Sequence, residues 1–191
     1  MKKLIFALIA GAAAMSAAQA QNAKPYIGLG VASSSHNFDL SGATSTDAAG
    51  TKSSAKIFGG VELTPTFGIE AGYTDLRKAD HSFVLPGTPG VNGTATTDGS
   101  RSYVAGKANF PLNDKFALYG KLGAGYSKVD VSSATPGVSR SANKTELYGA
   151  LGGQYNISEK VALTLEYERY GKQKDFGAKA DAITVAGRYN F

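Results

Sequence analysis

The sequence predicts an all-β protein, an eight-stranded antiparallel up-and-down transmembrane β-barrel preceded by a cleaved signal peptide. Three observations support this prediction. Apolar residues recur at every second position, aromatic residues cluster at the ends of the alternating segments, and short and long connections alternate along the chain. Alternation over segments of about ten residues is typical of strands that cross a membrane. The pattern places the apolar side chains on the lipid-facing side of each strand.

Composition excludes several other classes of protein. The 191 residues include 24 glycines, nine phenylalanines and ten tyrosines, but no tryptophan or cysteine. Without cysteine the chain cannot form a disulfide framework, a cysteine-bound metal site or a thiol nucleophile. Beyond the first twenty residues no apolar run approaches the ~18 residues of a membrane-spanning helix. We therefore exclude a helical membrane protein.

The first twenty residues have the form of a secretory signal peptide. Lys2 and Lys3 precede an apolar stretch over 4–14, and Ala18 and Ala20 give the small-x-small pattern at which a signal peptidase cuts. An uncleaved anchor helix is the alternative. The short apolar core and the intact cleavage pattern favour cleavage.

We predict a signal peptide over 1–20 and one barrel domain over 21–191. Loss of the two lysines in the signal peptide leaves 18 basic and 15 acidic residues, a net charge of +3. This charge is weak and dispersed along the chain. It does not favour binding to nucleic acid.

Eight segments alternate apolar residues with small or polar ones: 27–31, 56–63, 67–74, 101–110, 116–127, 146–155, 161–168 and 183–191. Three connections are short: 64–66, 111–115 and 156–160. Four are long: 33–54, 75–100, 128–143 and 171–179. Short turns on one side and long loops on the other are typical of a membrane barrel.

Aromatic residues on the apolar faces gather at two levels. Near the short connections they are Phe67, Phe110, Phe116, Tyr155, Tyr189 and Phe191. Near the long connections they are Tyr73, Tyr126 and Tyr167. Two aromatic girdles flanking an aliphatic band indicate contact with a lipid bilayer.

The opposite faces of the strands carry equal numbers of basic and acidic residues. The bases are Lys56, Arg101, Lys107, Lys121 and Arg188, and the acids are Glu62, Glu70, Glu146, Glu166 and Glu168. A Lys or Arg that faces lipid costs about 2–4 kcal/mol at the midplane of the bilayer. Charges in a lumen are tolerated if they are paired. Because side chains can fill an eight-stranded barrel, we predict an internal ion network and a closed interior.

A soluble, lipocalin-like barrel would also show alternation, with apolar residues inside and charges outside. Alternation alone does not distinguish the two arrangements. Glycines on the polar faces, aromatic residues at both levels and the aromatic residue Phe191 at the end of the chain favour lipid outside.

Four stretches resemble the OmpA-type transmembrane domain of Gram-negative outer membranes: AKIFGGVEL (55–63), FGIEAGYTDL (67–76), VAGKANFPLNDKFALYGKLGAGYS (104–127) and LGGQYNISEKVALTLEYERYG (151–171). The resemblance implies an outer-membrane location, contact with outer-membrane lipid and lipopolysaccharide, and assembly by the barrel assembly machinery. The terminal strand resembles the signal which that machinery recognises, carried here by Ile183, Val185, Tyr189 and Phe191.

The family also has a lumen cluster that blocks or gates a narrow path. Glu70 and Lys107 occupy the positions of a family glutamate and its lysine partner, so the resemblance implies a Glu70–Lys107 pair. Gln154 and Thr164 stand where the best-studied members carry a second glutamate and an arginine. We therefore do not expect the family's four-charge switch to be intact, and we expect a structural pair.

No catalytic, cofactor-binding or metal site is expected. His36 and His81 both fall in long connections, without the spacing of metal ligands, and the neighbouring Ser82 does not make a triad. Gly28 and Gly30 lie within a strand rather than before a helix, so they do not form a dinucleotide-binding loop.

We expect a structural outer-membrane barrel whose Ser-, Thr- and Gly-rich loops 33–54 and 86–99 serve in adhesion or as a receptor. The extracellular ligand is unknown. A narrow pore controlled by lumen ion pairs is the alternative, and a lipid-modifying enzyme is a third hypothesis. The chain ends before the Pro-rich hinge and peptidoglycan-binding module of longer family members, so we do not expect it to tether the cell wall by that route.

Overall fold

The described part of the chain consists of β-strands and their connections. The computed structural model describes residues 23–38, 44–45, 51–84, 92–133, 140–171, 176–178 and 180–191. The expected signal peptide, with Ala18 and Ala20, lies outside these residues. The long strands are β1 (Lys24–Phe38), β3 (Thr51–Glu62), β4 (Phe67–Val84), β5 (Asn92–Pro111), β6 (Phe116–Ser133), β7 (Arg140–Asn156), β8 (Val161–Tyr170) and β10 (Asp181–Asn190), and the short ones are β2 (Thr44–Ser45) and β9 (Phe176–Ala178).

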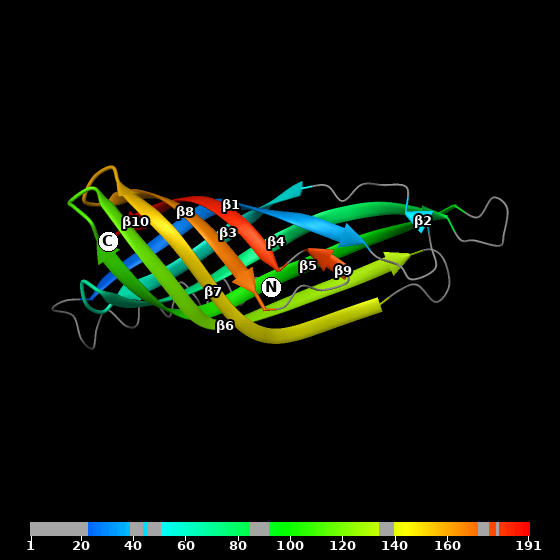
Figure 1. Cartoon of the computed structure of the whole chain (residues 1–191), viewed down its shortest axis with the longest axis horizontal. Helices are drawn as coiled ribbons and strands as arrows, with labels where there is room; N and C mark the ends of the chain where they lie inside the picture. Colours follow the sequence, from blue (N-terminus) through cyan, green and yellow to red (C-terminus); the bar gives the residue numbers. More distant parts are fainter. Residues whose placement is uncertain are drawn as a thin grey trace.

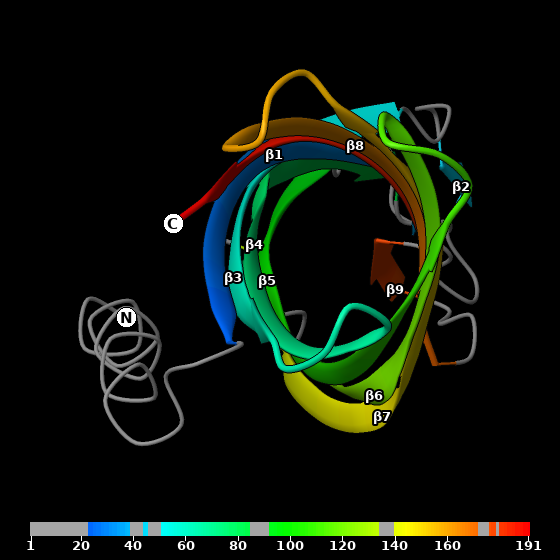
Figure 2. The same ribbon diagram turned by 90° about the vertical axis from the view of Figure 1, so that its left-hand side faces the viewer.

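The eight long strands form one closed antiparallel sheet. Each pairs with the next long strand along the chain, and β10 pairs with β1 from Tyr26↔Asn190 to Ser33↔Ile183. Viewed along its length, the sheet forms a ring (Figure 2). This confirms the predicted eight-stranded up-and-down barrel. No helix among the described residues is long and apolar enough to cross a membrane.

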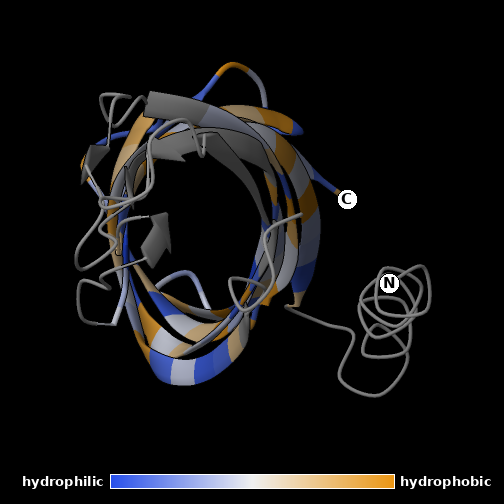
Figure 3. Cartoon of the chain, turned by 90° about the vertical axis from the view of Figure 1, so that its right-hand side faces the viewer, coloured by the Kyte–Doolittle hydropathy of each residue, from blue (hydrophilic) through white to orange (hydrophobic). Residues whose placement is uncertain are grey.

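Successive residues of a strand alternate between the outside and the inside of the barrel. In β8, Leu165 is 58% exposed, while its neighbours Thr164 and Glu166 are 7% and 3% exposed. When the strands are coloured by hydropathy, hydrophobic and hydrophilic residues accordingly alternate along them (Figure 3). Apolar side chains lie outside and polar ones inside, which is the reverse of the lipocalin-like alternative.

Exposed aromatic residues mark both ends of the apolar outer surface. Near the short turns Phe116 packs on Tyr155 with ring centroids 4.9 Å apart, and Tyr189 packs on Phe191 at 5.3 Å. At the other end Tyr167 is exposed on the outer face. Such residues occupy the membrane–water interface in transmembrane barrels.

The three short turns share one local structure. In each, a side-chain oxygen of the second turn residue accepts a hydrogen bond from the backbone N–H at the start of the next strand. Thr64 binds the N–H of Phe67 at 2.9 Å, and Asn113 binds that of Phe116 at 2.9 Å. Ser158 forms the same bond to the next strand. Side-chain acceptors of this kind stabilise tight connections.

At the opposite end the strands continue beyond the predicted boundaries. The long connections expected over 75–100 and 128–143 are largely strand, because β4 continues to Val84 and β5 begins at Asn92. Beyond the lipid both faces of a strand meet water, so polar residues suit both faces and the alternation disappears from the sequence. Backbone pairing alone then marks the strand.

The two histidines also lie in strands, and the prediction that they fall in loops is wrong. His36 pairs with Ala178 of β9, and His81 pairs with Ala95 of β5.

Glycines on the inner face make room for aromatic rings from neighbouring strands. A Cβ atom at Gly152 would lie 2.5 Å from Cζ of Tyr119 and 2.8 Å from the carbonyl oxygen of Leu165. Gly72 lies under the ring of Tyr103 in the same way. Close packing inside the lumen thus explains why these two positions are glycine.

We predict that Gly152→Ala destabilises the barrel by about 1–3 kcal/mol, the usual cost of overpacking a filled interior. The added methyl group would overlap both a ring and a backbone carbonyl. Urea unfolding of the protein refolded in lipid vesicles measures the change.

The adjacent Gly153 provides the matched control, because a Cβ there would have no neighbour within 4 Å. Gly153→Ala should leave the unfolding midpoint unchanged. Equal loss of stability in both variants would contradict the packing explanation.

Candidate functional site

The lumen contains a buried group of charged side chains, here called the central cluster. It comprises Lys56 on β3, Glu70 on β4, Lys121 on β6, and Glu166 and Glu168 on β8. All five residues are at most 6% exposed. Removing an ion from water costs several kcal/mol unless it is paired and hydrogen-bonded. The contacts inside the cluster therefore determine whether the barrel can hold it.

The five charges form one continuous chain of ion pairs. Lys121 contacts Glu70 at 2.6 Å and also contacts Glu166. Lys56 contacts Glu166 at 3.0 Å and Glu168 at 2.5 Å. The chain of alternating charges runs from the wall at β4 to the wall at β8.

Tyrosine hydroxyls supply further donors to the carboxylates at the ends of this chain. Glu70 accepts hydrogen bonds from Tyr26 at 2.8 Å and from Tyr103. Glu168 accepts one from Tyr170 at 2.8 Å. Neutral donors satisfy carboxylate oxygens without adding charge, so each terminal glutamate is stabilised from several sides.

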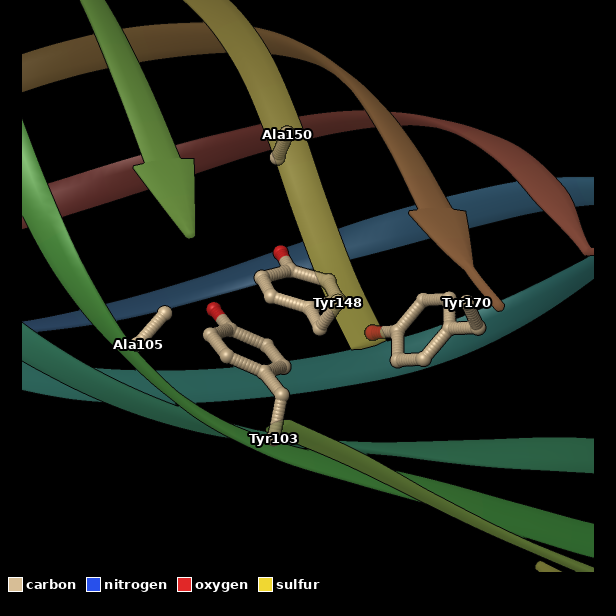
Figure 4. Close-up of a cluster of buried hydrophobic side chains, with 5 residues drawn as sticks. All are labelled: Tyr103, Ala105, Tyr148, Ala150 and Tyr170. Atoms are coloured by element: carbon tan, nitrogen blue, oxygen red, sulfur yellow. The ribbon is translucent and has the colours of Figure 1, made fainter. Parts of the chain in front are cut away.

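The rings of three buried tyrosines also pack against one another. Tyr103 and Tyr148 are stacked with centroids 4.2 Å apart, and Tyr170 tilts against Tyr148 at 4.8 Å (Figure 4). In this view the hydroxyls of Tyr103 and Tyr148 point the same way. Thr184 on β10 donates to Glu168. Rings and ion pairs together fill the middle of the lumen.

Sequence reasoning did not include these hydroxyl donors in the ion network. Tyr26, Tyr170 and Thr184 all occupy inward positions. The alternation of their strands could have placed them inside, but it could not show which carboxylate each would reach.

A second group of polar contacts lies nearer the short turns. The guanidinium of Arg188 donates to Glu62 at 2.7 Å and to Gln154 at 3.0 Å, and it lies 3.6 Å from the ring centroid of Tyr26. Arg guanidinium groups bind carboxylates and stack on aromatic faces in this manner. Gln154 thus serves as a neutral acceptor for this guanidinium.

The prediction of a direct ion pair between Glu70 and Lys107 is wrong, because Glu70 pairs with Lys121 instead. The ammonium of Lys107 lies 3.8 Å from Glu62 and 4.5 Å from the ring centroid of Tyr119. Lys107 and Lys121 face each other across β5 and β6. Like charges at opposed positions repel, and the two ammonium groups separate toward different carboxylates.

Arg101 lies toward the long-loop end of the lumen, with its guanidinium 4.9 Å from the ring centroid of Tyr170. Glu146, another inward acid, pairs with Lys144 at 2.8 Å. Gly171, at φ 65°, packs against Glu146, and a Cβ there would overlap that side chain. Arg101 is buried with the other lumen bases and lies over the ring of Tyr170.

The four residues expected to form the assembly signal lie at the outer face of the last strand. Ile183, Val185, Tyr189 and Phe191 are all exposed there. Their recognition by the assembly machinery stays a prediction.

The ion pairs of the central cluster join strands from opposite walls of the barrel, so this arrangement can hold the barrel together. Among the described residues, no group of three His, Cys, Asp or Glu side chains is placed to hold a metal ion.

Comparison with known proteins identifies the fold family. The sequence pattern of the family described as "Outer membrane protein beta-barrel domain" matches residues 4–191. The chain belongs to this family. Like its relatives, it is a protein of the outer membrane of Gram-negative bacteria.

Curated relatives include the attachment invasion locus protein of Yersinia pseudotuberculosis, 38% identical over 103 residues, which are 53% of this chain and 54% of that protein. Outer membrane protein A of Salmonella typhi is 26% identical over 145 residues, 72% of this chain and 39% of that protein. The chain thus spans about half of the length of the first relative and less than half of the length of the second. Neither name describes an enzyme.

Solved structures show the same fold. Ail, the attachment invasion locus protein of Yersinia pestis, superposes with a TM-score of 0.58 at 22% identity, covering 90% of this chain and all of that one. The N-terminal β-barrel domain of OprF from Pseudomonas aeruginosa gives 0.55 at 13% identity, covering 90% of this chain and 98% of that one.

We predict that Lys121→Met lowers the free energy of unfolding by about 3–5 kcal/mol, the usual loss when one partner of a buried ion pair is removed. The substitution takes the shared cation from both Glu70 and Glu166. Urea unfolding in lipid vesicles measures the loss.

Lys128→Met is the control, because the Lys128–Asp130 pair is exposed. Its effect should stay below about 1 kcal/mol. Adding Glu70→Gln to Lys121→Met should recover part of the loss, since it removes one unpaired charge. Equal effects at Lys121 and Lys128 would show that the central cluster does not stabilise the barrel.

Proposed function

We propose that the protein is a structural outer-membrane barrel that contacts molecules outside the cell through strands projecting beyond the membrane. The observation that supports this proposal most strongly is the unequal length of the strands. β8 and β10 have 10 residues each, about what a tilted strand needs to cross a bilayer, whereas β5 has 20. At about 3.3 Å per residue, the excess is on the order of 30 Å.

Four neighbouring strands form this extension, here called the projecting sheet: residues 76–84, 92–99, 129–133 and 140–146 of β4 to β7. They remain paired as far as Val84↔Asn92 in β4–β5 and Val131↔Arg140 in β6–β7. Figure 1 shows these strands extending well past the ends of β8 and β10. Because short turns face the periplasm in such barrels, the projecting sheet lies outside the cell.

The filled lumen supports a structural role over the pore alternative. Lys56 and Lys121 link carboxylates across the interior, and the rings of Tyr103 and Tyr148 pack beside them. An open water path would have to break these contacts. Binding functions on rigid scaffolds are usually carried by the parts that extend from them.

The similarity to the attachment invasion locus protein supports adhesion as the form this contact takes. We also propose that the outer face of β10, with Phe191 at its end, serves as the assembly signal, and that residues 1–20 are removed on export. The exposure of Ile183, Val185 and Tyr189 to lipid supports the first of these proposals.

We predict that shortening both projecting hairpins abolishes attachment. Residues 80–96 and 130–141 would each be replaced by an Asn-Gly turn, which suits a two-residue hairpin. A non-adherent laboratory Gram-negative strain expressing the parent chain should attach to cultured epithelial cells. The shortened chain should lower the number of attached bacteria at least tenfold, because the contact surface is gone.

Slower migration after heating, which reports an intact barrel in gel electrophoresis, serves as the folding control. Undiminished attachment by a folded, shortened chain would refute the proposed function.

A further inference from the structure

One buried ammonium group near the short turns lacks the close partners that Lys56 and Lys121 have. Lys107 on β5 is 2% exposed, yet its ammonium donates no hydrogen bond within the described part of the chain. Its nearest carboxylate oxygen there belongs to Glu62 and lies 3.8 Å away. An ammonium has three donors, and removing it from water costs several kcal/mol unless it is paired and hydrogen-bonded. Lys107 therefore has a buried charge that its neighbours compensate only in part.

The carboxylate oxygen nearest Lys107 already serves two other donors. Oε1 of Glu62 accepts a hydrogen bond from the guanidinium of Arg188 at 2.7 Å and one from the side-chain amide of Asn109 at 3.4 Å. We call Glu62, Lys107, Asn109 and Arg188 the mouth group. Arg188 makes the short contact and is the main partner of the carboxylate. One negative charge thus faces two positive charges, which leaves a surplus of one positive charge.

Aromatic rings beside Lys107 do not cancel this surplus. The ammonium lies 5.1 Å from the ring centroid of Tyr26 and 4.5 Å from that of Tyr119. Tyr26 also packs against the guanidinium of Arg188, so two cations share one ring. A ring face attracts a cation through its quadrupole but carries no net charge. The rings hold Lys107 in place without neutralising it.

The central cluster does not supply the missing partner either. It contains three carboxylates and two lysines, so it has one surplus negative charge. Glu70 accepts from Lys121 at 2.6 Å, from Tyr26 at 2.8 Å and from Tyr103. Hydroxyl donors thus stabilise the negative charge of the cluster where it lies, and the ammonium of Lys107 makes no ion pair with it.

The mouth group lies where the lumen opens toward the short turns. Glu62 keeps 21% of its side chain exposed, and Gln154 and Asn190, which bond to Arg188, are half-buried. Lys24 stands opposite Glu62 on β1 and is exposed, so it adds positive charge at this entrance. Charges of one sign around a narrow opening attract ions of the opposite sign. The short turns face the periplasm, so this compartment would supply the ion.

We propose that a small monovalent anion from the periplasm binds beside the ammonium of Lys107 and neutralises the surplus charge of the mouth group. Chloride and small carboxylates have this charge. The side-chain amide of Asn109 places a neutral N–H donor in the same group. A dianion would reverse the surplus instead of cancelling it. The site is separate from the strands that project outside the cell, so it does not rest on the proposed function.

The effect of chloride on stability tests this site. The protein refolded in lipid vesicles would be unfolded with urea in sodium chloride and in sodium gluconate of equal ionic strength, since gluconate is a much bulkier anion. An anion that binds only the folded state stabilises it by mass action. Chloride should lower the unfolding equilibrium constant about fivefold, as expected at roughly four times the dissociation constant.

Lys107→Met should abolish the difference between chloride and gluconate, because it removes the surplus charge. Lys160→Met is the matched control, since Lys160 is an exposed lysine in a turn on the same side of the membrane. It should respond like the parent, and general salt effects act on all three proteins alike. An equal response in the parent and in Lys107→Met would overturn the proposal. Loss of the response in Lys160→Met as well would show general charge screening and would also overturn it.

Glu62→Gln should change the response in the opposite direction. It removes the carboxylate of the mouth group and raises the surplus to two positive charges, so chloride should stabilise this variant more than the parent. A weaker response than that of the parent would contradict the assignment of the surplus. Sodium phosphate at equal ionic strength forms a further arm. A larger effect of phosphate than of chloride would overturn the assignment of a monovalent anion.

Bromide locates the site without any variant. It replaces chloride and scatters X-rays anomalously, so crystals of the protein grown in sodium bromide should show an anomalous peak in contact with the ammonium of Lys107. Absence of this peak would overturn the proposal. A peak in the crystal without a chloride effect in solution would mean binding at crystal concentration only, which overturns it too.

Discussion

The structure depends on one constraint: within lipid, every backbone N–H and C=O must find a partner in the protein. A flat sheet of eight strands would leave two unpaired edges in the hydrocarbon. The β1–β10 pairing removes both and turns the sheet into a ring. Closure in turn creates an interior, and the outer surface must be apolar. The polar residues of an alternating strand then have no other place than the lumen.

The filling of this interior follows from its size. A ring of eight strands leaves room for side chains but little else. The protein fills it with long side chains whose charged ends meet at the centre, as Lys56 and Lys121 do between three glutamates. Glycines opposite the aromatic rings keep the walls close, as Gly72 does beneath Tyr103. Charge and ring packing are thus two parts of one solution to a narrow polar space.

The sequence predicted the barrel well because lipid imposes a strict pattern on each strand. The eight segments, the short turns and the inward position of the charges all follow from alternation. Outside the bilayer that pattern ends, so the strand beyond Asp75 in β4 left no trace in hydropathy. Pairing between side chains was also beyond reach. Lys107 and Glu70 share the lumen, but strand tilt and the opposing Lys121 decide which carboxylate each lysine meets.

The ion pairs of the lumen join residues that are far apart in the chain. Lys56 and Glu168 are 112 residues apart, and Arg188 and Glu62 are 126 apart. Neither pair can form until the last strands have met the first ones. A sheet that opened within the membrane would expose these charges to hydrocarbon, at about 2–4 kcal/mol for each Lys or Arg near the midplane. The network therefore stabilises the closed barrel in the membrane and disfavours a partly open one, in which these charges would lack their partners.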